Sequence, residues 1–175
     1  MVRGIRRCPR RTSRLARVAW VALAVLAVGG QVALAQPPPP AVAARLETGR
    51  RALVSRIESL KKDDSIRPRL VADVEVFAKA VEWAVRHNEF YPPRSGAGTT
   101  AWIGYAERAL VIGSQRAEEL AAGKPSWVLR PGSSIRGYYS KVDGSVQPYA
   151  VSLPKGINPR SGTRHRLHLK LHGRG

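Results

Sequence analysis

The sequence predicts an α+β protein in which a helical region precedes a set of β-strands. Between residues 42 and 124, apolar residues recur at intervals of three and four, the spacing of an amphipathic helix. From Ser126 onward the spacing changes to alternation, and Asp143-Gly144 supplies a dipeptide typical of hairpin turns. With 43% apolar and 24% charged residues, the 175-residue chain has the composition of a globular protein, with room for one modest domain beside a targeting segment.

Residues 1–35 have the layout of a cleavable signal peptide. Seven arginines precede an unbroken apolar stretch, Val18–Val28, and Ala33-Leu34-Ala35 places small residues where a signal peptidase reads. We therefore expect export to the periplasm or the cell exterior. The alternative is an uncleaved membrane anchor, although Gly29-Gly30 interrupts the apolar stretch.

Removal of this leader changes the charge and the cysteine content of the chain. The formal charge of +18 falls to about +11, because 23 basic and 12 acidic residues remain. The single cysteine, Cys8, lies within the leader, so the mature chain has no thiol for a disulfide, a zinc cluster or a nucleophile.

Behind the leader we expect a Pro-rich linker over residues 36–41 and then three helices. The first helix is predicted over Val42–Lys62, the second from Pro68 to about Asn88, and the third from Thr99 or Thr100 to the Gly123 stop. Their apolar faces are expected to pack on one another. The aromatic residues are assigned to this core, with a ligand groove as the alternative: Phe77, Trp83, Trp102 and Tyr105.

The part of the chain from residue 125 to residue 175 is expected to be extended. A short strand is predicted over Trp127–Leu129, and a hairpin is predicted with strands Arg136–Val142 and Ser145–Leu153 around a tight Asp143-Gly144 turn. His165–Leu171 alternates leucine with polar residues, which predicts a third strand with one buried face.

The last forty residues resemble the opening of secreted α/β-hydrolases of the esterase and prolyl-oligopeptidase type. The resemblance rests on the hairpin around Asp143-Gly144, the apolar strand after it, and the terminal His172-Gly173-Arg174-Gly175. It implies that His172, Gly173 and Arg174 belong to an oxyanion-hole loop, in which glycine lets a backbone N–H approach the developing charge. Arg174 departs from the glycine that many members carry there. The alternative is a strand end followed by a flexible terminus.

The catalytic residues of that family are not found in this sequence. Its nucleophile lies in Gly-x-Ser-x-Gly, and the nearest run, at residues 132–136, has arginine in place of the last glycine and precedes the hairpin. We therefore expect an N-terminal fragment of an exported serine hydrolase for ester or peptide bonds, with no catalytic residue of its own and no activity alone. The alternative is a non-enzymatic exported helical protein that binds a partner through a basic surface.

No cofactor and no metal site are predicted. His168 and His172 share a face of the expected strand but lie about 13 Å apart along it, at roughly 3.3 Å per residue, which is too far for one ion. The basic residues near the end predict salt-sensitive, non-specific binding to polyanions, without a specific nucleic acid. A membrane contact is expected only through an uncleaved leader. These basic residues are Lys155, Arg160, Arg164, Arg166, Lys170 and Arg174.

Overall fold

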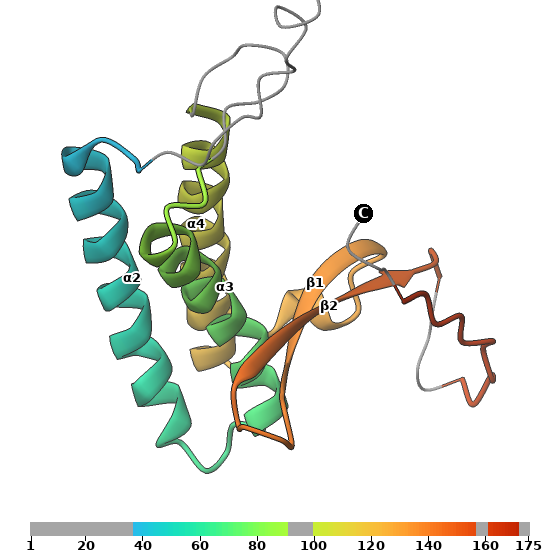
Figure 1. Ribbon diagram of the computed structural model, residues 1–175. Helices are drawn as coiled ribbons and strands as arrows, with labels where there is room; N and C mark the ends of the chain where they lie inside the picture. Colours follow the sequence, from blue (N-terminus) through green and yellow to red (C-terminus); the bar gives the residue numbers. More distant parts are fainter. Residues whose placement is uncertain (1–36, 91–99, 157–160, 172–175) are drawn as a thin grey trace, which may run out of the picture. The chain divides into compact units, whose positions relative to one another are not determined.

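The computed structural model describes residues 37–90, 100–156 and 161–171, and shows a mixed α+β protein (Figure 1). The predicted signal peptide and the predicted oxyanion residues His172, Gly173 and Arg174 lie outside the described residues. None of the described helices is long and apolar enough to cross a membrane. The elements in chain order are α2 (Pro40–Lys61), α3 (Pro68–Arg86), α4 (Thr100–Ala121), the 3-10 helix η1 (Ser126–Val128), β1 (Gly132–Tyr139) and β2 (Val146–Leu153).

The three predicted helices are confirmed, and two of them begin at a proline. Helix α2 begins at Pro40, so the predicted linker over residues 36–41 overlaps the helix by two residues. Helix α3 also begins at a proline, Pro68, whose missing N–H costs nothing in a first turn. Between these helices the Asp63 carboxylate accepts hydrogen bonds from the N–H and the hydroxyl of Ser65, at 2.9 and 2.6 Å, which stabilises the turn.

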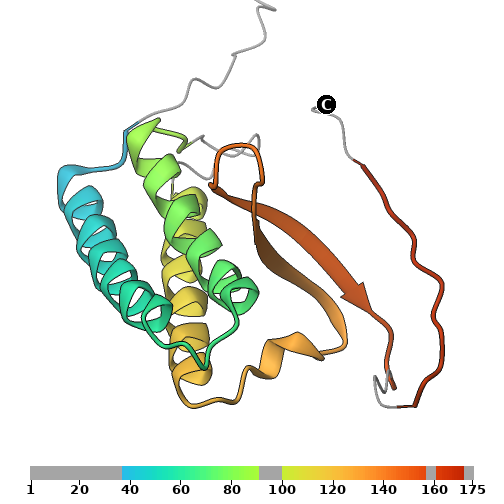
Figure 2. The same ribbon diagram turned by 90° about the horizontal axis from the view of Figure 1, so that it is seen from below.

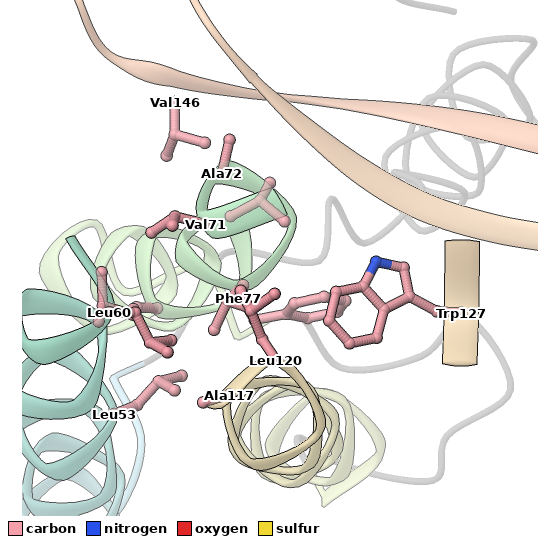
Figure 3. Close-up of a cluster of buried hydrophobic side chains, with 13 residues drawn as sticks. Leu53, Leu60, Val71, Ala72, Phe77, Ala117, Leu120, Trp127 and Val146 are labelled. Carbon is pink, nitrogen blue, oxygen red and sulfur yellow. The ribbon is translucent and has the colours of Figure 1, made fainter. Parts of the chain in front are cut away.

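The main core lies between the three helices and extends beneath the hairpin (Figure 3). Leu53 and Leu60 of α2 meet Phe77 of α3 and Leu120 of α4, and all four are at least 94% buried. Helix α4 can approach α2 closely because Gly113 lacks a side chain. A Cβ at Gly113 would lie 2.6 Å from a methyl carbon of Leu53. The amphipathic spacing therefore identified the faces that pack together.

The predicted strand over Trp127–Leu129 is wrong, because Ser126–Val128 forms a 3-10 turn. Pro125 precedes the turn and restricts the chain there. The Trp127 ring enters the core and is only 3% exposed, whereas Leu129 is 52% exposed. A single large side chain fixes this segment, so a short apolar run did not require a strand.

The predicted hairpin is confirmed as an antiparallel pair, but its strands and turn differ from the expectation. Pairing runs from Gly132 opposite Leu153 to Tyr139 opposite Val146, so β1 begins and ends earlier than predicted. Six residues, 140–145, form the loop, in which Gly144 has φ +70° while Asp143 stays outside the positive-φ region. The Asp143 carboxylate instead accepts the Ser145 N–H at 3.2 Å. The dipeptide marks the turn without forming a two-residue loop.

The third strand predicted over His165–Leu171 is not present. The described sheet has two strands, β1 and β2, and residues 161–171 lie outside regular secondary structure. Leu167, Leu169 and Leu171 are 88%, 81% and 84% exposed. Alternating leucines can form a strand only where a neighbouring strand and a covering layer exist, and no described residue provides either.

Candidate functional site

A groove of about 640 Å³ opens between helix α3 and the β-hairpin, which lie side by side (Figure 2). Its volume is in the range of small-molecule sites, about 300–1,000 Å³. Most of its lining is apolar, and its polar groups come from α3 on one side and from the hairpin on the other. We call this feature the α3–hairpin groove. It is lined by Val76, Phe77, Lys79, Ala80, Trp83, Ala109, Ile135, Asp143, Ser145, Gln147 and Pro148.

The hairpin is held against α3 by the close approach of Gly137. A Cβ at Gly137 would lie 2.0 Å from the carbonyl oxygen of Ala72, so only glycine fits without displacing β1. Next to this contact, the side chain of Val146 is 5% exposed and packs over α3 (Figure 3). These contacts fix the distance between α3 and the hairpin, and the groove lies between the two elements at that distance.

A buried carboxylate, Asp73, connects α3 to both η1 and β1. It is 1% exposed. Its Oδ2 accepts hydrogen bonds from Arg136 Nε at 2.7 Å and from Trp127 Nε1 at 3.1 Å, while Oδ1 accepts the Gly137 N–H at 2.9 Å. A buried carboxylate is stable only when it is paired and hydrogen-bonded, and these three donors satisfy that requirement.

A buried guanidinium, Arg116 of α4, complements Asp73. It donates to the carbonyl oxygen of Ile135 at 2.7 Å and to the Ser134 hydroxyl at 2.9 Å, and it lies 4.9 Å from the centroid of the Phe77 ring. Burial lowers the Arg116 pKa to about 10, so the group remains charged at neutral pH. Arg116 and Asp73 thus bind backbone groups of β1 that would otherwise form an unprotected strand edge.

Lys79 and Trp83 form the polar and aromatic part of the α3 wall. The Lys79 ammonium donates to the carbonyl oxygen of Val146 at 2.6 Å and lies 5.2 Å from the Trp83 ring centroid. Trp83 is 49% exposed. The core assignment is therefore correct for Phe77 and wrong for Trp83, which borders the groove.

The core assignment is also wrong for Trp102 and Tyr105, which are 39% and 62% exposed on α4. Their rings contact each other edge to face at 5.8 Å between centroids. Their helical spacing placed them on the expected apolar face of α4. Spacing alone cannot show which part of that face is covered by other helices. The two aromatic residues are not part of the groove lining.

The hairpin wall is held by a chain of side-chain hydrogen bonds. Gln147 Nε2 donates to the Ser145 hydroxyl at 2.7 Å, and this hydroxyl donates to the Asp143 carboxylate at 3.0 Å. Hydrogen bonds from Ser140 and Ser145 lower the Asp143 pKa, so this carboxylate is ionised at neutral pH. The groove therefore has one cation on α3 and one anion on the hairpin loop.

The groove lining contains no nucleophile paired with a base. Ser145 is the only hydroxyl in the lining, and it contacts a carboxylate and an amide, with no histidine among the lining residues. Among the described residues, no group of three or more His, Cys, Asp or Glu side chains could hold a metal ion. His165 and His168 are exposed in the segment after the hairpin.

Sequence reasoning missed the residues that position the hairpin. Arg116 lies four residues after Ile112 and four before Leu120, so its place on an apolar helix face was a usable signal of a buried cation. Asp73 likewise lies beside Val74 in an apolar stretch. Comparison with known proteins adds nothing further: no family model, curated protein or solved structure matches this chain.

Proposed function

We propose that this chain provides the helical region and the opening hairpin of an exported serine hydrolase for ester or peptide bonds. The observation that carries the proposal is the row of three exposed leucines, Leu167, Leu169 and Leu171, between the hairpin and His172-Gly173-Arg174-Gly175. Burial of one leucine side chain contributes about 1.5–3 kcal/mol. A segment with this pattern is suited to a sheet that is covered on its apolar face.

The two edges of the hairpin differ in how far side chains of the helices cover them. The edge of β1 is covered by Asp73 and Arg116, which bind the Gly137 N–H and the Ile135 carbonyl. Among the described strands, β2 pairs only with β1. A larger sheet would therefore extend from the β2 edge over Tyr149–Leu153, because the Val146 carbonyl already accepts the Lys79 ammonium and Pro148 offers no N–H.

The nucleophile of the proposed enzyme is expected in sequence that follows residue 175. We expect the 175-residue chain alone to release no p-nitrophenol from p-nitrophenyl acetate or butyrate above the buffer rate. A longer product of the same gene should contain Gly-x-Ser-x-Gly and hydrolyse these esters, and replacement of its serine by alanine should abolish turnover. If none of the three forward reading frames encodes this motif within several hundred nucleotides after codon 175, the proposal is wrong.

A leucine substitution tests the structural part of the proposal separately from catalysis. In the 175-residue chain Leu169→Asp should change the free energy of unfolding by less than about 0.5 kcal/mol, because the side chain is 81% exposed. In the longer protein the same change should cost about 2–5 kcal/mol, because a charge would replace a buried leucine. Equal effects in the two proteins would contradict a buried strand.

The second candidate is an exported binding protein without enzymatic activity. It is favoured by the α3–hairpin groove, whose lining holds a half-exposed tryptophan but no nucleophile paired with a base. The absence of the serine motif downstream would support this candidate. The ligand that such a groove selects can be examined whether or not the chain belongs to a hydrolase.

A further inference from the structure

We propose that the α3–hairpin groove binds an apolar organic monoanion, with the negative group on the Lys79 ammonium and the apolar body along Phe77, Ile135 and Pro148. The inference does not depend on the hydrolase proposal. It rests on the volume of the groove, its mostly apolar lining and the arrangement of its two charges.

The charge of Lys79 is available to a ligand. The basic residues Arg45, Arg56 and Arg136 form ion pairs with carboxylates, whereas no described carboxylate lies within ion-pair distance of the Lys79 ammonium. Its contacts are the Val146 carbonyl and the face of Trp83. An ammonium has three N–H donors, and the carbonyl uses one of them. A carboxylate or sulfonate could therefore accept a charge-assisted hydrogen bond there.

The second charge in the lining orients the ligand. Asp143 lies on the hairpin loop, and its carboxylate is engaged by the hydroxyl and the N–H of Ser145. It repels an anion from that wall and favours placement of the negative group beside α3. The apolar body then contacts Phe77 and Ile135, and the half-exposed Trp83 borders the anionic group. The lining supplies a single cation, which matches one negative group, and the Asp143 carboxylate disfavours a second negative group in the ligand.

Two fluorescent probes of similar shape test the proposal on the 175-residue chain. Anilinonaphthalene sulfonate is an apolar monoanion, and N-phenylnaphthylamine is its uncharged counterpart. Lys79→Met keeps the length of the side chain and removes its charge, so we expect a five- to tenfold weaker Kd for the sulfonate and an unchanged Kd for the neutral probe. Asp143→Asn, which preserves the turn, should tighten sulfonate binding about twofold.

Two further variants separate the groove from general surface charge and from misfolding. Lys124→Met removes an exposed lysine that is not in the groove lining, and should leave both dissociation constants unchanged. Ala80→Phe places a ring in the groove from an exposed position on α3, and should weaken both probes at least tenfold. Circular dichroism melts must show that each variant unfolds cooperatively near the wild-type temperature. Equal sulfonate affinity in wild type and Lys79→Met, or unaltered binding by Ala80→Phe, would overturn the proposal.

Discussion

Removal of the Asp73 carboxylate should weaken the attachment of the hairpin to the helices. In Asp73→Ala, the Trp127 indole N–H and the Gly137 N–H each lose their acceptor, and the Arg136 guanidinium loses its counter-ion. A buried donor without a partner costs about 1–3 kcal/mol. Breaking a buried ion pair costs about 3–5 kcal/mol. We expect a loss of about 3–5 kcal/mol, which is a large part of the total stability of a domain, on the order of 5–15 kcal/mol.

Urea unfolding, followed by tryptophan fluorescence and by circular dichroism, measures this effect. Glu58→Gln is the matched control, because Glu58 pairs with Lys61 on an exposed helix surface, where an ion pair contributes about 0–1 kcal/mol. The double variant of Asp73→Ala with Arg136→Met should be more stable than the sum of the single effects predicts, since it removes the uncompensated cation. A loss below about 1 kcal/mol in Asp73→Ala would refute the assignment of Asp73 as the connection between α3 and β1.

Further substitutions test the close approach of Gly137, the ion pairs of Glu47 and the basic residues of the last segment. Gly137→Ala should destabilise the protein by about 1–3 kcal/mol or more through overpacking. Gly104→Ala, where a Cβ meets nothing within 4 Å, should instead stabilise α4 by about 0.5–1 kcal/mol. Urea unfolding measures both effects. Hydrogen bonds from Arg50 and its neighbour Arg51 lower the Glu47 pKa from 4.5 to about 2. The ionised carboxylate therefore contributes stability that is lost as pH falls from about 4.5 to 2. In a series of thermal melts at different pH, Glu47→Gln should reduce this loss, by less than about 1 kcal/mol. Heparin retention should fall at a given salt concentration when three exposed basic residues of the last segment are replaced by alanine, and unchanged retention would assign polyanion binding elsewhere. These residues are Arg164, Arg166 and Lys170.

The helices were predictable because each carries its own signal. Leu53 and Leu60 share one face of α2 at helical spacing, and Pro68 marks the start of α3 whatever the rest of the chain does. The exposed aromatic pair on α4 could not be assigned in this way. The spacing of Trp102 and Tyr105 fits an apolar face, but the spacing does not say whether another element packs against that face, and both residues are exposed.

The contacts that create the groove could not be predicted, because they join residues far apart in the sequence. Asp73 and Gly137 are separated by 64 residues, and neither position alone indicates the other. The positions of the glycines in the sequence also did not indicate which of them is a close contact. A Cβ at Gly137 would collide with α3, whereas a Cβ at Gly104 would meet open space. Local sequence therefore identified the elements, whereas the hairpin's position on α3 depends on buried charges and one close backbone approach.

Two segments of alternating residues, the hairpin and residues 165–171, show why pattern alone does not make a strand. Val146 is 5% exposed because the hairpin brings it over α3, where β1 is already held by Asp73 and Arg116. Leu169 also alternates with polar residues in the sequence, yet it is 81% exposed. The difference lies in the partner: the hairpin is anchored along the β1 edge by helix side chains, and the later segment meets no described surface that could cover its leucines. Strand formation in this chain therefore requires both a neighbouring strand and a covering layer, and a sheet edge that pairs with residues 165–171 while its protein covers Leu167, Leu169 and Leu171 should convert this segment into a strand.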